Sequence, residues 1–165
     1  MRGYAQTSRG QVHFRHEGRA GPAVVCFHEA PMSSEIYAPA LPVLARSFRA
    51  YAFDTPGHGF SDKPARQPTI EEYGATLLEA IDDIGLEELI IVGCHTGADI
   101  GLEVARQAGA ARVTHAVLTG VPLMKPDEWE SYFERVLSRA GPASRPRAGP
   151  STSHPTGSRP STAPT

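Results

Sequence analysis

The chain has 165 residues, about the length of one domain, with 40% hydrophobic residues and a formal net charge of -2. A charge this close to neutral gives no reason to expect a nucleic acid or an anionic membrane as a partner, because both favour a basic protein face. No apolar run reaches the ~20 residues that span a bilayer, and the N-terminus lacks the apolar core of a secretion signal, so we expect a cytoplasmic protein.

The predicted elements alternate between strands and helices. In chain order they are strands over 4–7, 11–16 and 23–28, a helix over 34–48, a strand over 49–54, a helix over 70–84, a strand over 89–92, a helix over 97–108, a strand over 113–118 and a helix over 128–137. The run 23–28 is continuously apolar, which suits a strand buried on both faces of a parallel sheet. The alternation predicts an α/β fold, a three-layer sandwich with a mainly parallel sheet.

Two of the predicted helices carry clear local signals. Pro39 and Pro42 fall early in the helix over 34–48. Its regular part should begin near one of them, because proline fits the first turn of a helix and breaks its interior. In the following helix, Thr69 can cap the N-terminus while Glu72 reaches back to complete a capping box.

The composition changes abruptly near the C-terminus. Residues 139–165 contain no Val, Leu, Ile, Met or aromatic residue. Such a segment cannot bury enough apolar surface to offset its conformational entropy, so we expect a folded domain over 1–138 and a disordered tail over 139–165. The change resembles a frameshifted or truncated coding end; the alternative is a Pro-rich recognition tail.

Three segments follow predicted strands, where open α/β sheets place their ligand sites. They are HEAP at 28–31, DTPGHGFSD at 54–62 and GCHTGA at 93–98. Together they resemble the α/β-hydrolase fold, in which His-Gly-x-Pro forms the oxyanion loop, Asp-x-x-Gly-x-Gly-x-Ser follows a later strand, and Gly-x-Ser-x-Gly is the nucleophile elbow. The resemblance covers residues 3 to about 125 and implies a truncated form of that fold.

The resemblance places His95 at the nucleophile position, where the family has Ser, Asp or Cys. Gly93 and Gly97 would give the room that the sharp turn needs, and the backbone N–H of Thr96 would face a developing oxyanion. An imidazole could attack an activated acyl group itself or act as a general base on water. Cys94 should point elsewhere in the turn and is not expected to replace the nucleophile.

The oxyanion loop completes the candidate site, which consists of His28, Glu29, His95 and Thr96. His28 matches the family's loop histidine and is expected to brace the loop by hydrogen bonds rather than to act directly. Glu29 stands where the family has glycine, and its carboxylate would oppose a developing negative charge unless it points to solvent or is protonated. Alternatively, Glu29 orients an imidazole. His115 is expected to be a residue of its strand rather than a catalytic base.

The segment 54–62 is expected to be structural. Ser61 and Asp62 can hydrogen-bond back to the loop, and His58 is expected to be solvated. A ligand-lining role for Asp54 is the alternative.

Two classes of function compete. The first is a hydrolase of a small ester, epoxide or related small-molecule substrate, with no cofactor, because water and oriented dipoles supply the chemistry. The second is a catalytically inactive fragment or non-enzymatic scaffold, whose exposed sheet edge would favour self-association. A third idea is a metal site formed by His28, His95 and either Glu29 or Asp54, although no ligand-spacing motif supports it.

Overall fold

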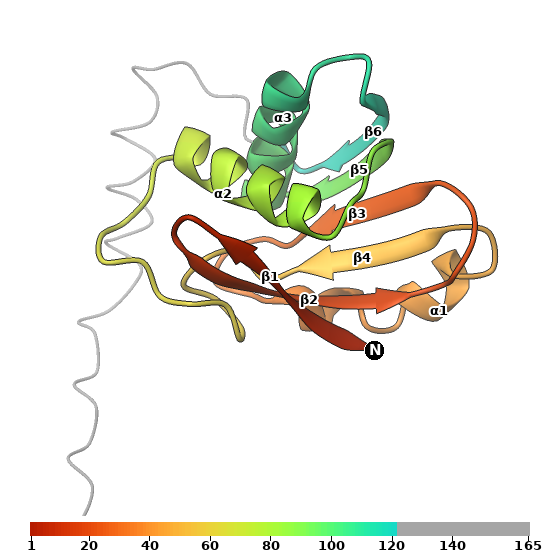
Figure 1. Cartoon of the computed structure of the whole chain (residues 1–165), viewed down its shortest axis with the longest axis horizontal. Coiled ribbons are helices and arrows are strands. Elements are labelled where there is room, and N and C mark those ends of the chain that lie inside the picture. The colour runs from red at the N-terminus through yellow and green to blue at the C-terminus, as the bar shows by residue number, and fades with distance from the viewer. Residues whose placement is uncertain (122–165) are drawn as a thin grey trace, which may run out of the picture. The chain divides into compact units, whose positions relative to one another are not determined.

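The computed structural model describes residues 1–121, which form one six-stranded sheet with helices against it (Figure 1). The strands are β1 (Arg2–Thr7), β2 (Gly10–Glu17), β3 (Ala23–Phe27), β4 (Arg49–Phe53), β5 (Leu89–Cys94) and β6 (Val113–Thr119). The helical elements are η1 (Ser34–Tyr37), α1 (Leu41–Leu44), α2 (Ile70–Asp83) and α3 (Thr96–Ala108). The helix predicted over 128–137, the domain boundary at 138 and the predicted tail over 139–165 lie outside the described residues.

The sheet has the order β1-β2-β4-β3-β5-β6. β1 and β2 form an antiparallel hairpin and β2 lies antiparallel to β4, whereas β4, β3, β5 and β6 run parallel to one another. The predicted α/β fold with a mainly parallel sheet is therefore confirmed. The carboxyl ends of β3, β4 and β5 meet at one edge of the sheet. The three segments that resemble α/β-hydrolase motifs, 28–31, 54–62 and 93–98, lie at this edge.

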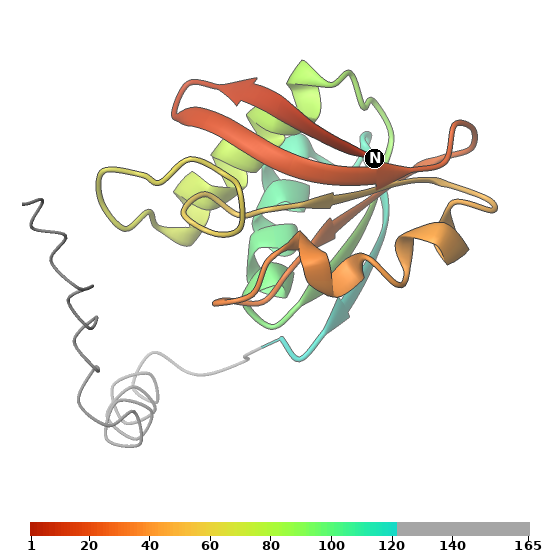
Figure 2. The ribbon, with the colours of Figure 1, turned by 90° about the horizontal axis from the view of Figure 1, so that it is seen from below.

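Apolar side chains cover both faces of the sheet. All five residues of β3 are buried, as expected for the continuous apolar run. The larger core packs α2 and α3 against one face, through side chains such as Leu77, Ile81 and Val104. The smaller core packs Leu41 of α1 and Tyr37 of η1 against the other face. Figure 2 shows these helices on opposite sides of the strands, which gives the three predicted layers.

The helix predicted over 34–48 is wrong as one continuous element, although regular helix begins at Leu41, beside Pro42, as expected. The structure has the 3₁₀ turn η1 and the short helix α1 instead, with Pro39 in the turn between them. Pro39 has no N–H with which to continue the first turn, so regular helix resumes only after it. Pro42 is tolerated because it falls in the first turn of α1.

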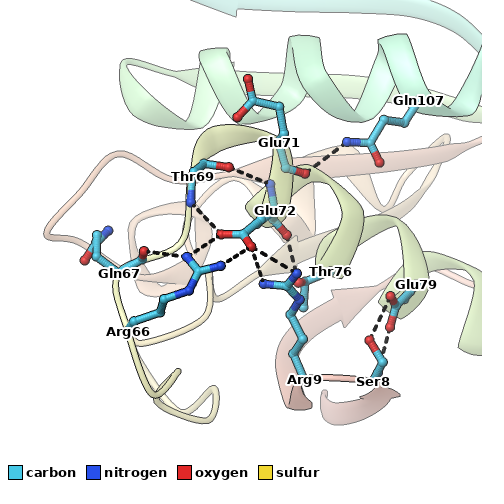
Figure 3. Close-up of polar contacts among 10 residues, drawn as sticks. All are labelled: Ser8, Arg9, Arg66, Gln67, Thr69, Glu71, Glu72, Thr76, Glu79 and Gln107. Carbon is cyan, nitrogen blue, oxygen red and sulfur yellow. Dashed lines mark hydrogen bonds and ion pairs between the residues drawn. The ribbon is translucent and has the colours of Figure 1, made fainter.

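The capping box predicted for α2 is confirmed (Figure 3). The N–H of Glu72 donates to Thr69 Oγ1 at 3.3 Å, and the N–H of Thr69 donates to Glu72 Oε2 at 3.0 Å. The same carboxylate accepts hydrogen bonds from Arg66 and Arg9. The hydrogen bonds from Arg66 and from the Thr69 backbone lower the pKa of Glu72 to about 2. Glu72 thus ties the start of α2 to the loop before it and to the β1–β2 turn.

Among residues 1–121, no helix combines the length and the apolar character that crossing a membrane requires.

Candidate functional site

The connection from β5 to α3 is a sharp bend at a single residue. β5 ends at Cys94 and α3 begins at Thr96, so His95 alone joins them, with φ 49° and ψ -122°. Within residues 1–121, His95 is the one non-glycine residue with a positive φ. Its N–H donates to the carbonyl of Thr119 at 2.9 Å, and its carbonyl accepts from the N–H of Ala98 at 2.7 Å. The surroundings therefore hold a backbone conformation that costs roughly 1–3 kcal/mol.

The glycines on both sides of His95 allow neighbouring elements to approach closely. A Cβ at Gly97 would collide with the carbonyl oxygen of Phe27, and a Cβ at Gly93 would collide with the backbone of Gly97. Glycine is needed at both positions to bring the start of α3 against the end of β3. This is the packing expected of an elbow.

The loop after β3 lies against this elbow. The N–H of Ala30 donates to Thr96 Oγ1 at 2.7 Å, which joins the loop to the first residue of α3. His28 is 1% exposed, and both of its ring nitrogens are engaged. Nδ1 donates to the carbonyl of Glu29 at 2.9 Å, and Nε2 accepts from the N–H of Thr55 at 3.0 Å. Burial lowers the pKa of His28, so the ring is held neutral in a bracing arrangement.

Glu29 points toward the elbow. Its Oε2 lies 3.7 Å from Nε2 of His95, with the two side chains 38% and 62% exposed. This is an ion-pair distance rather than a hydrogen bond. The Glu29 carboxylate therefore faces the imidazole of His95. The ring of His95 also lies over Gly120, where a Cβ would come within 3.1 Å of Nε2.

Cys94, the last residue of β5, directly precedes His95. Strand alternation puts its side chain on the sheet face of Ile90 and Val92, opposite to α3. There, its Sγ lies within 4.8 Å of the ligand atoms of both Glu29 and His95, a group that could hold a metal ion. Cys94 and Cys26 are both free thiols.

A cavity of about 470 Å³ opens beside the elbow. His28, Thr55 and Thr96 contribute to its wall, together with apolar side chains that include Tyr73 of α2 and Ile100 of α3. Within the described part of the chain, His95 stands next to this wall rather than in it. Two candidate residues, His28 and Thr96, thus line the cavity, whereas Glu29 and His95 do not.

The loop over 54–62 is organised around a buried carboxylate. Asp54 is 1% exposed and accepts hydrogen bonds from the N–H groups of Ser34 (2.6 Å) and Phe60 (2.9 Å) and from Nδ1 of His13 (2.8 Å). Burial raises the pKa of Asp54, but the N–H donors of Phe60 and Ser34 outweigh it, so the pKa lies below its ordinary value. The structural role predicted for this loop fits these contacts.

The remaining side chains of that loop behave partly as expected. Ser61 donates to the carbonyl of Asp54 at 2.7 Å, and the carbonyl of Asp62 accepts from the N–H of Gly57 at 2.9 Å. His58, expected to be solvated, is instead half-buried in the cavity wall, with its ring centroid 5.6 Å from that of His28. The close packing of the loop against the β3 end brings it there.

The metal ligands considered in the sequence analysis come together only in part, because Glu29 and His95 meet whereas His28 and Asp54 are engaged elsewhere. Asp54 already accepts hydrogen bonds from His13 and from two backbone N–H groups. The ring nitrogens of His28 are engaged by the carbonyl of Glu29 and the N–H of Thr55. His115 is an exposed residue of β6, paired in register with Ile90.

Comparison with known proteins decides the family. A model of the alpha/beta hydrolase fold matches residues 22–157. The chain belongs to the α/β-hydrolase family. Within this family it is 33% identical to haloalkane dehalogenase 2 of Mycobacterium tuberculosis (strain ATCC 25618 / H37Rv) over 134 residues, which are 80% of this chain and 46% of that protein. It is also 33% identical to a non-heme haloperoxidase of Rhodococcus erythropolis over 127 residues, 73% of this chain and 45% of that protein.

Solved α/β hydrolases have the same fold. A hydrolase from Pseudomonas aeruginosa PA01 superposes with a TM-score of 0.69 at 25% identity, covering 82% of this chain and 52% of that one. An N-acyl homoserine lactonase complexed with N-butanoyl homoserine gives 0.69 at 25% identity, covering 78% and 47%. The chain spans about half the length of the curated relatives that it matches. These relatives have different reactions, so the comparison shows the family and no single substrate.

Proposed function

We propose that this chain hydrolyses a small ester, epoxide or related substrate, with His95 as its base. The observation that supports this most directly is the position of His95. Its imidazole stands at the strand–helix bend, 62% exposed, and the next residue, Thr96, lines the cavity of about 470 Å³. A cavity with apolar walls and a few polar groups suits a small, largely uncharged molecule.

For an ester, the reaction needs one water and one proton carrier. The imidazole of His95 removes a proton from a water molecule as that water attacks the acyl carbon. When the tetrahedral intermediate collapses, the carbon–oxygen bond to the alcohol breaks. The same proton returns from the imidazolium to the leaving oxygen, giving an acid and an alcohol. An epoxide would be opened by the same activated water.

The developing oxyanion would be met by backbone donors. The N–H of Thr96 belongs to the first turn of α3, where N–H groups have no acceptor within the helix. The N–H of Ala30, on the facing loop, is the second candidate, and it must first leave Thr96 Oγ1. The N–H of Thr96 lies at the N-terminus of α3, where the helix dipole gives a partial positive charge that stabilises an anion. The N–H of Ala30 faces this N-terminus from the loop after β3.

Glu29 would act through His95. Its carboxylate lies 3.7 Å from Nε2, close enough to hold the imidazole ring in one orientation. Glu29 is therefore proposed as a positioning residue, and His28 as a brace for the loop.

The test compares two histidine deletions in the full chain. His95→Ala should abolish hydrolysis of short-chain p-nitrophenyl esters above the buffer rate. The matched control His115→Ala also removes one exposed histidine, and it should keep the activity. Circular dichroism of both variants checks that the fold is unchanged.

Two results would contradict this proposal. One is activity that survives in His95→Ala. The other is the absence of turnover by the unaltered chain across esters, epoxides and haloalkanes.

A second candidate is a non-enzymatic scaffold that associates with copies of itself. Its support is β6, which is the last strand of the sheet within residues 1–121 and exposes 55% of Val117. An unpaired strand edge with exposed apolar residues promotes association. Sedimentation velocity should then show dimers that Val117→Lys weakens; a monomer at all concentrations would count against this role.

A further inference from the structure

Three side chains with different ligand chemistries meet beside the elbow, on the sheet face away from α3. They are the carboxylate of Glu29, the thiol of Cys94 and the imidazole of His95. Their ligand atoms all lie within 4.8 Å of one another, and Nε2 of His95 is 3.7 Å from Oε2 of Glu29. Oxygen, sulfur and nitrogen thus converge on one small volume.

The spacing fits a small ion with four ligands. Zinc binds sulfur at ~2.3 Å and nitrogen or oxygen at ~2.0–2.2 Å, so ligand atoms around a tetrahedral zinc lie roughly 3.3–3.6 Å apart. The carboxylate and the imidazole are already near that separation. Since no two ligand atoms are more than 4.8 Å apart, no separation has to close by much more than about 1 Å.

The fold holds two of the three ligands in place. Cys94 is the last residue of β5 and pairs with Thr119 of β6. His95 is fixed by its backbone hydrogen bonds to Thr119 and Ala98. Glu29 comes two residues after Phe27, which pairs with Gly93, so the sheet register brings its loop alongside the elbow. The backbone of two of the three ligand residues is therefore fixed before any ion arrives.

We propose that Glu29, Cys94 and His95 form a binding site for Zn²⁺ or a divalent transition metal of similar softness, with a fourth position left for water. A thiolate with an imidazole selects zinc-like ions over Mg²⁺ and Ca²⁺, which require oxygen ligands. Cys94 releases its proton on binding, and the two negative charges of thiolate and carboxylate balance the ion. Three protein ligands and one open position are typical of sites where a metal also meets small molecules.

This site goes beyond the proposed hydrolysis but shares His95 with it. A metal on Nε2 would take the lone pair or the hydrogen that general-base action needs, so zinc should inhibit any esterase activity of the chain. Binding can nevertheless be measured without turnover. A chain that binds zinc but has no esterase activity would contradict only the proposed hydrolysis. A chain that is active but does not bind zinc would contradict only the metal site.

The direct test is titration of the chelator-treated full chain with Co²⁺ and with Zn²⁺. Co²⁺ should produce a near-ultraviolet thiolate charge-transfer band at one ion per chain, and Zn²⁺ should displace it. Cys94→Ser should remove the band and weaken Zn²⁺ binding more than about tenfold, since even outer-shell substitutions cost roughly 10–100-fold. The matched control Cys26→Ser removes a fully buried thiol outside the group and should leave both readouts unchanged.

A second measurement needs no variant. Iodoacetamide labelling followed by peptide mapping should show that Zn²⁺ slows alkylation of Cys94, whereas the buried Cys26 stays unlabelled with and without metal. The inference is overturned if Zn²⁺ leaves the alkylation rate of Cys94 unchanged. It is also overturned if Cys94→Ser retains the Co²⁺ band, because the ion would then be held elsewhere.

Discussion

Replacing His95 by alanine and by glycine should reverse the usual stability order of these two residues. Alanine keeps the Cβ and therefore the strain of φ 49° and ψ -122°, whereas glycine accepts this conformation freely. Relief of the strain is worth roughly 1–3 kcal/mol, and the greater freedom of glycine in the unfolded chain costs about 0.5–1 kcal/mol. His95→Gly should therefore be more stable than His95→Ala by about 1 kcal/mol.

The free energy of unfolding, measured by urea denaturation with both variants fitted to a common slope, provides the assay. Leu102, 45% exposed in the middle of α3, supplies the reference position. There, Leu102→Ala should be more stable than Leu102→Gly by about 1 kcal/mol, the ordinary helix preference. If alanine is also the more stable residue at position 95, the backbone there is not strained and the elbow geometry is wrong.

Three further predictions concern the elements around the site. Gly97→Ala should destabilise the fold by about 1–3 kcal/mol in thermal or urea unfolding, because the added methyl collides with the Phe27 carbonyl; an unchanged midpoint would refute this packing. Thr69→Ala should cost about 1 kcal/mol, since it removes the side-chain cap of α2, while Thr69→Ser should retain most of that stability. The depressed pKa of Glu72, about 2, means that its stabilisation is present above the unfolded pKa and is lost as pH falls toward 2. Glu72→Gln, which can still complete the capping box, should show a smaller loss of stability between about pH 5 and 2, and identical pH profiles would contradict the assignment.

Features that depend on a few neighbouring residues could be predicted from the sequence. The capping box of Thr69 and Glu72 is a local pattern, and the bend at His95 follows from the glycines that flank it. The start of regular helix near Pro42 was also predictable, whereas the length of the helix over 34–48 was not, because η1 and α1 are separate short elements.

Contacts that join distant strands could not be predicted in this way. The bond between His13 and Asp54 links β2 to the end of β4, across 41 positions. Nothing in the local sequence distinguishes His13 from His16, the other histidine of β2. Only the hydrogen bond to the buried carboxylate of Asp54 shows that His13 helps to hold the loop over 54–62. Similarly, the meeting of Glu29 with Cys94 and His95 depends on the register of β3 against β5. That register is set by tertiary packing rather than by either segment alone.

The hydrogen bond from Ala30 to Thr96 Oγ1 has a consequence for selectivity. The N–H of Ala30 already donates to the hydroxyl of Thr96, so a substrate oxygen that binds this N–H must displace that hydroxyl. The net stabilisation is only the difference in strength between the two hydrogen bonds. A neutral carbonyl is about as good an acceptor as a hydroxyl and gains little, whereas an anionic oxygen forms a bond roughly twice as strong. The N–H of Ala30 should therefore bind the oxyanion of a transition state more strongly than the neutral carbonyl of the substrate. Such a difference in binding lowers the barrier of the chemical step.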